Sequence, residues 1–145
     1  MITLIAGLLG GVLGAASMRA LSARSTADEP SEVALLLARV SEGDARSYGA
    51  LGTAGHLLYG AAAGALFALV AVSFLGWGSA LWVAGLFYGM VLAAVAMLGW
   101  GPLIGMQERM ASLGPGQRTS RFALFLAGHG LYGLVAGAVI QTLAA

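Results

Sequence analysis

Residues 54–65 read Ala-Gly-His-Leu-Leu-Tyr-Gly-Ala-Ala-Ala-Gly-Ala, and residues 127–138 read Ala-Gly-His-Gly-Leu-Tyr-Gly-Leu-Val-Ala-Gly-Ala. The second stretch follows the first by 73 residues, and together they contain both histidines of the chain, His56 and His129. Each stretch lies in a long apolar run, and about 20 apolar residues are what a helix needs to cross a membrane. The pair therefore predicts two related membrane-spanning helices.

The composition and the distribution of charge also indicate a membrane protein. The chain of 145 residues is 59% hydrophobic and 9% charged, whereas about a quarter of the residues of a soluble domain are charged. Residues 1–18, 47–107 and 122–145 contain no Asp, Glu, Lys or Arg. Because a charge at the bilayer centre costs about 2.5–3.5 kcal/mol, such runs are candidates for membrane spans.

The lengths of these runs predict an all-α polytopic fold with four transmembrane helices in one membrane domain, residues 1–145. We expect spans at about residues 2–18, 49–75, 80–100 and 122–143, with a break at residues 76–79. The first span lacks the basic n-region of a signal peptide, which favours a retained helix. Residues 19–48 and 101–121 are the expected polar loops, and a turn or two of helix is expected around residues 107–113.

A short amphipathic helix is predicted in the first loop. Its apolar side chains follow the i, i+3, i+4, i+7 pattern at residues 33, 36, 37 and 40, while Glu32 falls off that stripe. Pro30 suits a first turn, Ser31 can cap the helix and Gly43 can end it. We expect this helix to lie on the membrane surface or against the bundle, with a docking site for a partner as the alternative.

Arginine placement predicts the orientation. All seven basic residues are arginines, and all lie in the two polar loops, which four spans place on one side of the membrane. The positive-inside rule makes that side cytoplasmic. We therefore expect an inner or plasma membrane protein with both termini and the 76–79 connection outside.

The first and third spans are also related, although more weakly. Ala6-Gly7-Leu8 recurs as Ala84-Gly85-Leu86, Gly11 corresponds to Gly89, and Ala15-Ala16 corresponds to Ala93-Ala94. The chain is thus interpreted as two helical hairpins in tandem. Because each hairpin crosses twice, the halves are parallel repeats, related by a pseudo-twofold axis along the membrane normal.

Spacing places the histidines on the small-residue faces of their helices. His56 is followed at intervals of four by Gly60 and Gly64, and His129 by Gly133, Gly137 and Gln141, so each set shares one helical face. Tyr59 and Tyr132 flank these faces. Glycines at such spacing let helix backbones approach closely. The predicted helix-packing residues are Gly7, Gly11, Gly60, Gly64, Gly85, Gly89, Gly133 and Gly137.

Three hypotheses remain open for the histidine pair. The first is interhelical hydrogen bonding, which is worth about 0.6 kcal/mol on average in a membrane. The second is ligation of one haem b iron by His56 and His129, with no other metal site expected. The third is passage of protons, ions or a small solute, with Tyr59, Tyr132 and Gln141 extending a polar relay. No acid lies within any predicted span to couple such movement.

Several functional classes are disfavoured. The absence of cysteine excludes disulfides, thiolate nucleophiles and iron–sulfur clusters. A net charge of +1 gives no sign of nucleic-acid binding. Two histidines without neighbouring carboxylates do not make a nucleophile–base–acid set, so we do not expect an enzyme. The first-ranked expectation is an accessory or scaffold subunit, a homo-oligomer or part of a membrane complex, which assembles in the lipid bilayer through its small-residue faces.

The paired Gly-His-x-Leu-Tyr-Gly motif resembles small, functionally uncharacterised four-span membrane proteins of archaea and bacteria. The resemblance covers about two of the four spans and implies no activity. Histidines on the second and fourth helices also resemble, in arrangement alone, the b-type membrane cytochromes, which implies the haem alternative.

Overall fold

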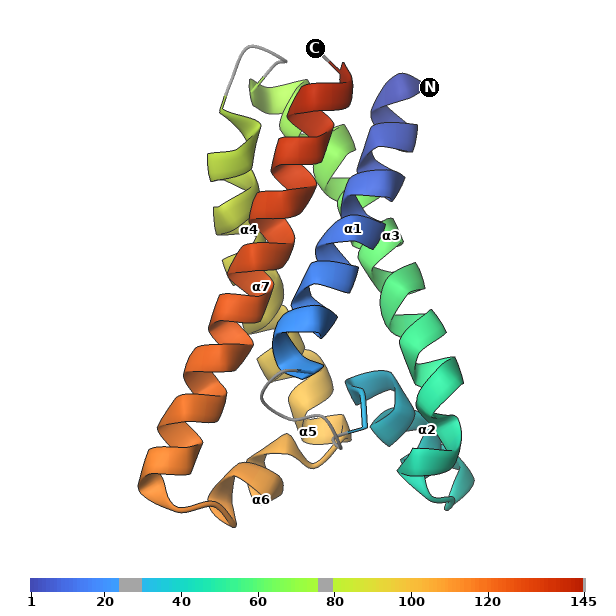
Figure 1. The fold of residues 1–145 in the computed structure, drawn as a ribbon, viewed down its shortest axis with the longest axis vertical. Helices are drawn as coiled ribbons and strands as arrows, with labels where there is room; N and C mark the ends of the chain where they lie inside the picture. The colour runs from blue at the N-terminus through green and yellow to red at the C-terminus, as the bar shows by residue number, and fades with distance from the viewer. Residues whose placement is uncertain (24–29, 76–79, 145) are drawn as a thin grey trace.

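The protein is an all-α bundle of four long helices, as the sequence predicts. The computed structural model describes residues 1–23, 30–75 and 80–144, and no strand occurs among them. The long helices are α1 (Ile2–Ala23), α3 (Gly49–Leu75), α4 (Leu81–Val95) and α7 (Pro115–Ala144), and they stand side by side (Figure 1). Four segments are long and apolar enough to cross a membrane: Ile2–Ala23, Ala45–Leu75, Leu81–Leu103 and Pro115–Leu143.

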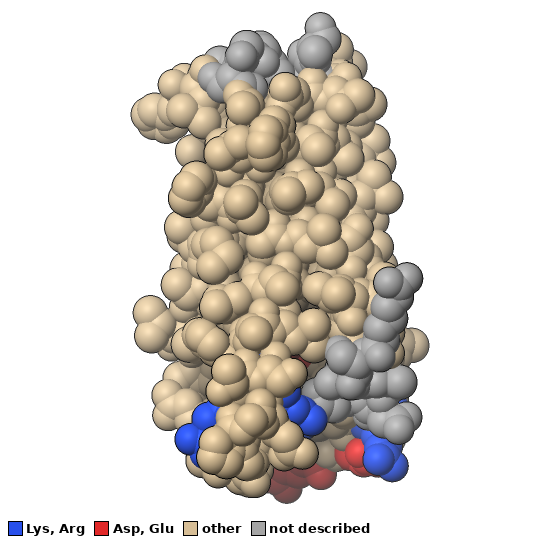
Figure 2. Space-filling view, turned by 60° about the vertical axis from the view of Figure 1, so that its left-hand side comes forward, with Lys and Arg blue, Asp and Glu red and all other residues tan. Residues whose placement is uncertain are grey.

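The remaining elements gather at the end of the bundle opposite the two termini (Figure 1). They are α2 (Glu32–Ser41), η1 (Ala45–Tyr48), η2 (Ala96–Trp100), α5 (Gly101–Leu103) and α6 (Met106–Ala111). Figure 2 shows that the charged side chains visible on that face of the molecule also lie at this end. We call it the arginine end, and the opposite end the terminal end.

Two helices are longer than their apolar runs. α7 begins at Pro115, and not near residue 122, while α1 continues to residue 23, past the expected end at 18. The reason is that hydropathy marks the apolar part of a helix, whereas its polar turns continue beyond that part. Much of the expected loop 101–121 is helical too, including the predicted turn at α6. The predicted break at 76–79 lies outside the described residues.

Glycines bring the long helices into backbone contact. A Cβ atom on Gly11 of α1 would collide with the carbonyl oxygen of Gly60 in α3. A Cβ on Gly133 of α7 would likewise collide with the carbonyl oxygen of Gly85 in α4. All eight glycines that spacing predicts as packing residues lie in these two contacts: Gly7, Gly11, Gly60, Gly64, Gly85, Gly89, Gly133 and Gly137. They hold α1 against α3 and α4 against α7.

A second glycine face of α1 contacts α7. A Cβ on Gly10 would lie 2.9 Å from the carbonyl oxygen of Ala136, and one on Gly14 would lie 2.6 Å from that of Tyr132. Gly14 follows Gly10 at an interval of four, just as Gly11 follows Gly7. Since the two pairs are offset by three residues, α1 packs closely against α3 on one side and α7 on the other.

α3 and α4 meet through side chains and not through backbone. The rings of Phe67 and Tyr88 stack with centroids 4.8 Å apart, and the Tyr88 hydroxyl donates to the carbonyl of Ala63 at 2.8 Å. Tyr88 and Leu92 stand 78 residues after Gly10 and Gly14, the same offset that relates Gly7 to Gly85. Large side chains therefore occupy α4 where α1 has glycine, and they prevent a close approach of α3.

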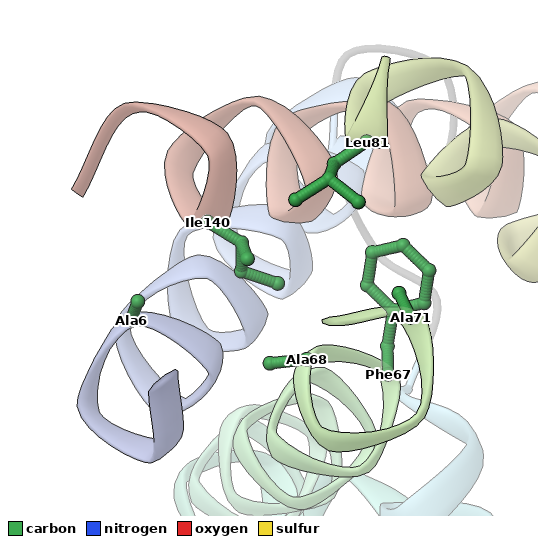
Figure 3. Packing of buried hydrophobic residues seen from close by; sticks show 6 residues of the cluster. All are labelled: Ala6, Phe67, Ala68, Ala71, Leu81 and Ile140. Atoms are coloured by element: carbon green, nitrogen blue, oxygen red, sulfur yellow. The ribbon is translucent and has the colours of Figure 1, made fainter. Parts of the chain in front are cut away.

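The terminal half of the bundle is filled by an apolar cluster. It contains Ala6, Phe67, Ala68, Ala71, Leu81 and Ile140, which point toward one another between the helices (Figure 3). Leu81 and Ile140 are completely buried. This packing closes the bundle at the terminal end, whereas the arginine half contains cavities.

The amphipathic helix α2 packs against the bundle. The Ser31 hydroxyl caps it by accepting from the backbone N–H of Ala34 at 3.2 Å, as predicted. Its fully buried Ala34 lies against Gly52 of α3. The helix ends differently from expectation, because Glu42 and not Gly43 takes the left-handed conformation, with φ of 54°. The Gly43 N–H then donates to the carbonyl of Ala38.

Candidate functional site

Both histidines line one cavity in the arginine half. Its volume is about 220 Å³, and its walls come from α1, α2, α3, α4, η2 and α7, together with Ile104. The polar and aromatic side chains around it are Glu32, His56, Tyr59, Trp100, His129 and Tyr132. We call it the histidine cavity. The 73-residue repeat thus brings its two imidazoles and both tyrosines to the same space.

His56 presents an unpaired nitrogen. Its Nε2 atom is buried and makes no hydrogen bond within the described part of the chain. The carbonyl of Ala15 in α1 lies near the ring. Because buried polar groups are nearly always hydrogen-bonded, an imidazole nitrogen that no described residue pairs with, in the wall of a cavity, favours a bound partner.

The contacts of His129 fix its tautomer. Its Nδ1 atom lies 3.0 Å from the carbonyl oxygen of Phe125, one turn earlier in α7. A carbonyl only accepts, so Nδ1 carries the proton and a neutral ring leaves Nε2 as an acceptor. The Phe125 ring also packs against the imidazole, with centroids 4.3 Å apart. His129 is therefore held in place by its own helix.

The two tyrosines have different surroundings. Tyr132 is 4% exposed, and its hydroxyl donates to the carbonyl of Gly60 at 2.7 Å, which joins α7 to α3. Tyr59 is 40% exposed and lies beside Trp100, which is exposed to the same extent. Tyr132 is thus part of the inner wall, while Tyr59 and Trp100 form the rim between α3 and η2.

An acid that the sequence analysis did not assign to the site also reaches it. Glu32 stands in the first turn of α2 and lines the histidine cavity. Burial raises the pKa of its carboxyl above the ordinary value. The apolar stripe gave no such signal, because Glu32 falls off it, but Glu32 precedes Leu36 by four residues and therefore flanks the side of α2 that packs on the bundle. The spans contain no acid, yet an acid from the first loop stands beside the histidines.

A larger cavity adjoins the first one. It has a volume of about 450 Å³ and shares Met18, Glu32, His56 and Ile104 with the histidine cavity. Its remaining charged lining residues are Arg19, Arg109 and Arg121. We call it the arginine cavity. His56 and Glu32 therefore stand between a space lined by arginines and a space without them.

A local widening of the third span shapes both cavities. In η2 the Gly101 N–H donates to the carbonyl of Ala96, five residues earlier, which is the π-helical pattern. Such segments are often found at functional sites. Ala96 and Trp100 line the histidine cavity, and Met97 lines the arginine cavity.

Gln141 does not belong to this site. Its Oε1 atom is buried without a hydrogen-bond partner among the described residues. However, Gln141 follows His129 by 12 residues in α7, about 18 Å at 1.5 Å per residue, and lines neither cavity. The structure brings four of the five residues predicted for a relay together and leaves Gln141 in the terminal half.

The described residues contain no cluster of three or more His, Cys, Asp or Glu side chains arranged to hold a metal ion. Comparison with known proteins gives no relative: no protein-family model, no curated protein and no solved structure matches this chain. The site must therefore be interpreted from its own chemistry.

Proposed function

We propose that the protein binds a small solute in the histidine cavity, which the solute reaches from the arginine half of the bundle. The observation that carries this proposal is the buried, unpaired Nε2 atom of His56 in the wall of a cavity. Ionisable side chains inside a membrane domain are costly and mark functional sites by default. A bound solute would supply the missing hydrogen bond.

Cavity size favours a small solute over a haem. The space that both imidazoles line is about 220 Å³, below the range of about 300–1,000 Å³ that is usual for ligand pockets. Ligation of haem by His56 and His129 would need a macrocycle between the two rings. Haem binding stays a prediction, and its signature is a Soret band that disappears in His56→Ala or His129→Ala.

The closed terminal half favours access from one side. The apolar cluster around Leu81 and Ile140 fills the space between the helices there, so both cavities lie on the arginine side of it. This asymmetry fits a binding protein, and it equally fits one state of a transporter that must rearrange to release its solute elsewhere. Flux through protein-containing vesicles would distinguish the two.

An accessory role in assembly is less well supported. The glycines expected to attract a partner are already in contact with one another inside this chain, in α1 against α3 and α4 against α7. A second copy or another subunit would have to use other faces. Assembly stays a prediction without an identified surface.

We also propose that the bundle is a tandem repeat, with the arginine end in the cytoplasm and both termini outside. Equivalent glycine contacts in the two hairpins support the repeat. All seven arginines lie within residues 19–46 and 109–121, between the uncharged runs, which supports the orientation through the positive-inside rule.

Ligand-induced stabilisation tests the proposed function. The wild-type protein in detergent micelles is heated with each of five probes that cover four charge classes: the cation tetramethylammonium, the anions acetate and phosphate, the zwitterion betaine and the neutral glycerol. We expect at least one probe to raise the unfolding temperature, because a ligand that binds only the folded state stabilises it. The increase should be lost in His56→Ala and in His129→Ala.

Gln141→Ala is the matched control, because Gln141 is a half-buried polar residue of the same helix as His129 but lies away from both cavities. Its probe-induced increase should equal that of the wild type. An absence of stabilisation by all five probes, or equal stabilisation of the histidine variants, would contradict the proposal.

A further inference from the structure

The charge and the aromatic lining of the histidine cavity indicate which solute it accepts. We infer that this solute is a small organic cation of the alkylammonium type, held by the carboxylate of Glu32 and by the aromatic side chains of Tyr59, Trp100 and Tyr132. The inference rests on the proposed function and narrows it to one chemical class. Neither the histidines nor the sequence repeat suggests it, because its key residue comes from α2.

Charge is the first argument. Among the described residues that line the histidine cavity, Glu32 is the only Asp, Glu, Lys or Arg. Burial raises the pKa of this carboxyl, and the described arginines near it line the adjoining cavity, which Glu32 shares. An ionised carboxylate that is buried without a partner is unfavourable. A bound cation would provide that partner.

The aromatic side chains are the second argument. Three of them, Tyr59, Trp100 and Tyr132, surround a space of about 220 Å³. Tyrosine and tryptophan faces attract cations, and recognition of quaternary ammonium groups by several aromatic rings is the main functional use of this interaction. Trp100 and Tyr59 are far more exposed than Tyr132, so they stand at the rim of the cavity.

The walls also distinguish an organic cation from a metal ion. Hard inorganic cations need six or more oxygen ligands in place of their water, and here one carboxylate faces mostly apolar side chains such as Leu92 and Ile104. Alkyl groups pack well against such walls. The neutral imidazole of His129 can accept a hydrogen bond from an N–H group of the solute.

The adjoining arginine cavity predicts a different binding site for a solute that is an anion. Arg19, Arg109 and Arg121 line that space, so an anionic solute would be expected there and not beside Trp100. Cation and anion probes thus report on different cavities.

Equilibrium dialysis of the full chain in detergent micelles, with radiolabelled tetramethylammonium at fixed ionic strength, measures the binding directly. We expect the wild type to bind it saturably. Glu32→Gln should weaken binding by roughly tenfold or more, since the one charge of the cavity is removed. Glu42→Gln is the matched control, because it removes the same charge from the exposed end of the same helix, and it should bind like the wild type.

Two substitutions of Trp100 test the inference separately, so the result does not depend on whether Glu32→Gln folds. Trp100→Phe retains an aromatic face and should bind almost normally, whereas Trp100→Leu should bind roughly threefold or more weakly. Binding unchanged in Glu32→Gln, or equal binding in the two Trp100 variants, would overturn the inference. If acetate or glycerol binds in a histidine-dependent manner while tetramethylammonium does not, the cation assignment fails and the proposed function stands. If no probe binds, both fail.

Discussion

Gly133 shows how little space separates the helices of this bundle. A Cβ at this position would collide with the carbonyl oxygen of Gly85 and would lie 2.8 Å from the backbone nitrogen of Gly89. Only backbone atoms surround it, so no side chain can turn aside to make room. The counterpart of Gly133 in α3, Gly60, also faces backbone on one side. A Cβ on Gly60 would lie 2.9 Å from the carbonyl oxygen of Gly11. These contacts make the stability sensitive to a single methyl group.

Gly133→Ala should therefore lower the free energy of unfolding in mixed micelles by about 1–3 kcal/mol, the usual cost of overpacking a tight core. The control is Gly116→Ala in the same helix, where an added Cβ would have no neighbour within 4 Å. Gly116→Ala should leave the stability unchanged or slightly higher. Equal losses in the two variants would show that the contact with α4 does not account for the effect.

Tyr132→Phe should remove the hydrogen bond that joins α7 to the Gly60 carbonyl of α3. We expect a loss of about 0.6 kcal/mol, the average for such bonds in membrane proteins, measured by the same unfolding assay. The control is Thr142→Val, because the Thr142 hydroxyl bonds only to Ala138 within its own helix. A Tyr132→Phe variant as stable as the wild type would mean that the bond contributes nothing.

The element that most affects the site is α2, which the apolar stripe and the Ser31 cap predict well. Its position was not predictable to the same extent, because amphipathicity alone does not distinguish a membrane surface from a protein surface. Packing of Ala34 against Gly52 fixes it on the bundle and turns Glu32 toward the histidines. The cavities themselves were likewise unpredictable, since they depend on distances between helices and on the π-helical turn at η2.

Glu32 should make the stability depend on pH. Burial raises the pKa of this carboxyl from the ordinary value of 4.5, so the folded protein holds the proton to a higher pH than the unfolded chain does. The folded state then binds more protons in the window above 4.5, and the free energy of unfolding falls as the pH rises through that window. Glu32→Gln should lack this fall, as measured by denaturation at a series of pH values.

In Glu42→Gln, which carries the matched substitution at the exposed end of α2, the free energy of unfolding should still fall as the pH rises. If Glu32→Gln and the wild type lost stability in parallel, another group would be responsible for the pH dependence.

At the scale of the whole molecule, the termini lie at one end and the arginines at the other (Figures 1 and 2). The four-helix architecture was predictable because long uncharged runs have few other solutions. The paired motif at His56 and His129 was also visible in the sequence, and the structure brings its two histidines to one cavity, while the tandem repeat of the hairpins stays a proposal. The different roles of Tyr88 and Leu92 in α4 and of Gly10 and Gly14 in α1 could not be predicted. The comparison of these positions has a meaning only once it is known which helices are neighbours.

The absence of cysteine makes the orientation easy to test. We expect Thr142→Cys, at the terminal end, to react with a membrane-impermeant maleimide added to intact cells. Ser112→Cys, at the arginine end, should react only after the membrane is permeabilised, because the positive-inside rule places it in the cytoplasm. Both positions are exposed. The opposite pattern of labelling would reverse the proposed orientation.

The substitution of tyrosine and leucine for two glycines also determines how this bundle is able to move. Along α1 and α7 the backbones pack closely at Gly10 and Gly14, with the Tyr132 ring beside Gly14, so we expect this contact to stay fixed when the bundle moves. Across the molecule, α3 and α4 meet through the stacked rings of Phe67 and Tyr88 and the hydrogen bond from Tyr88 to Ala63, and we expect this side-chain contact to rearrange more readily. A rotation of one hairpin relative to the other would therefore widen or narrow the space on the aromatic side.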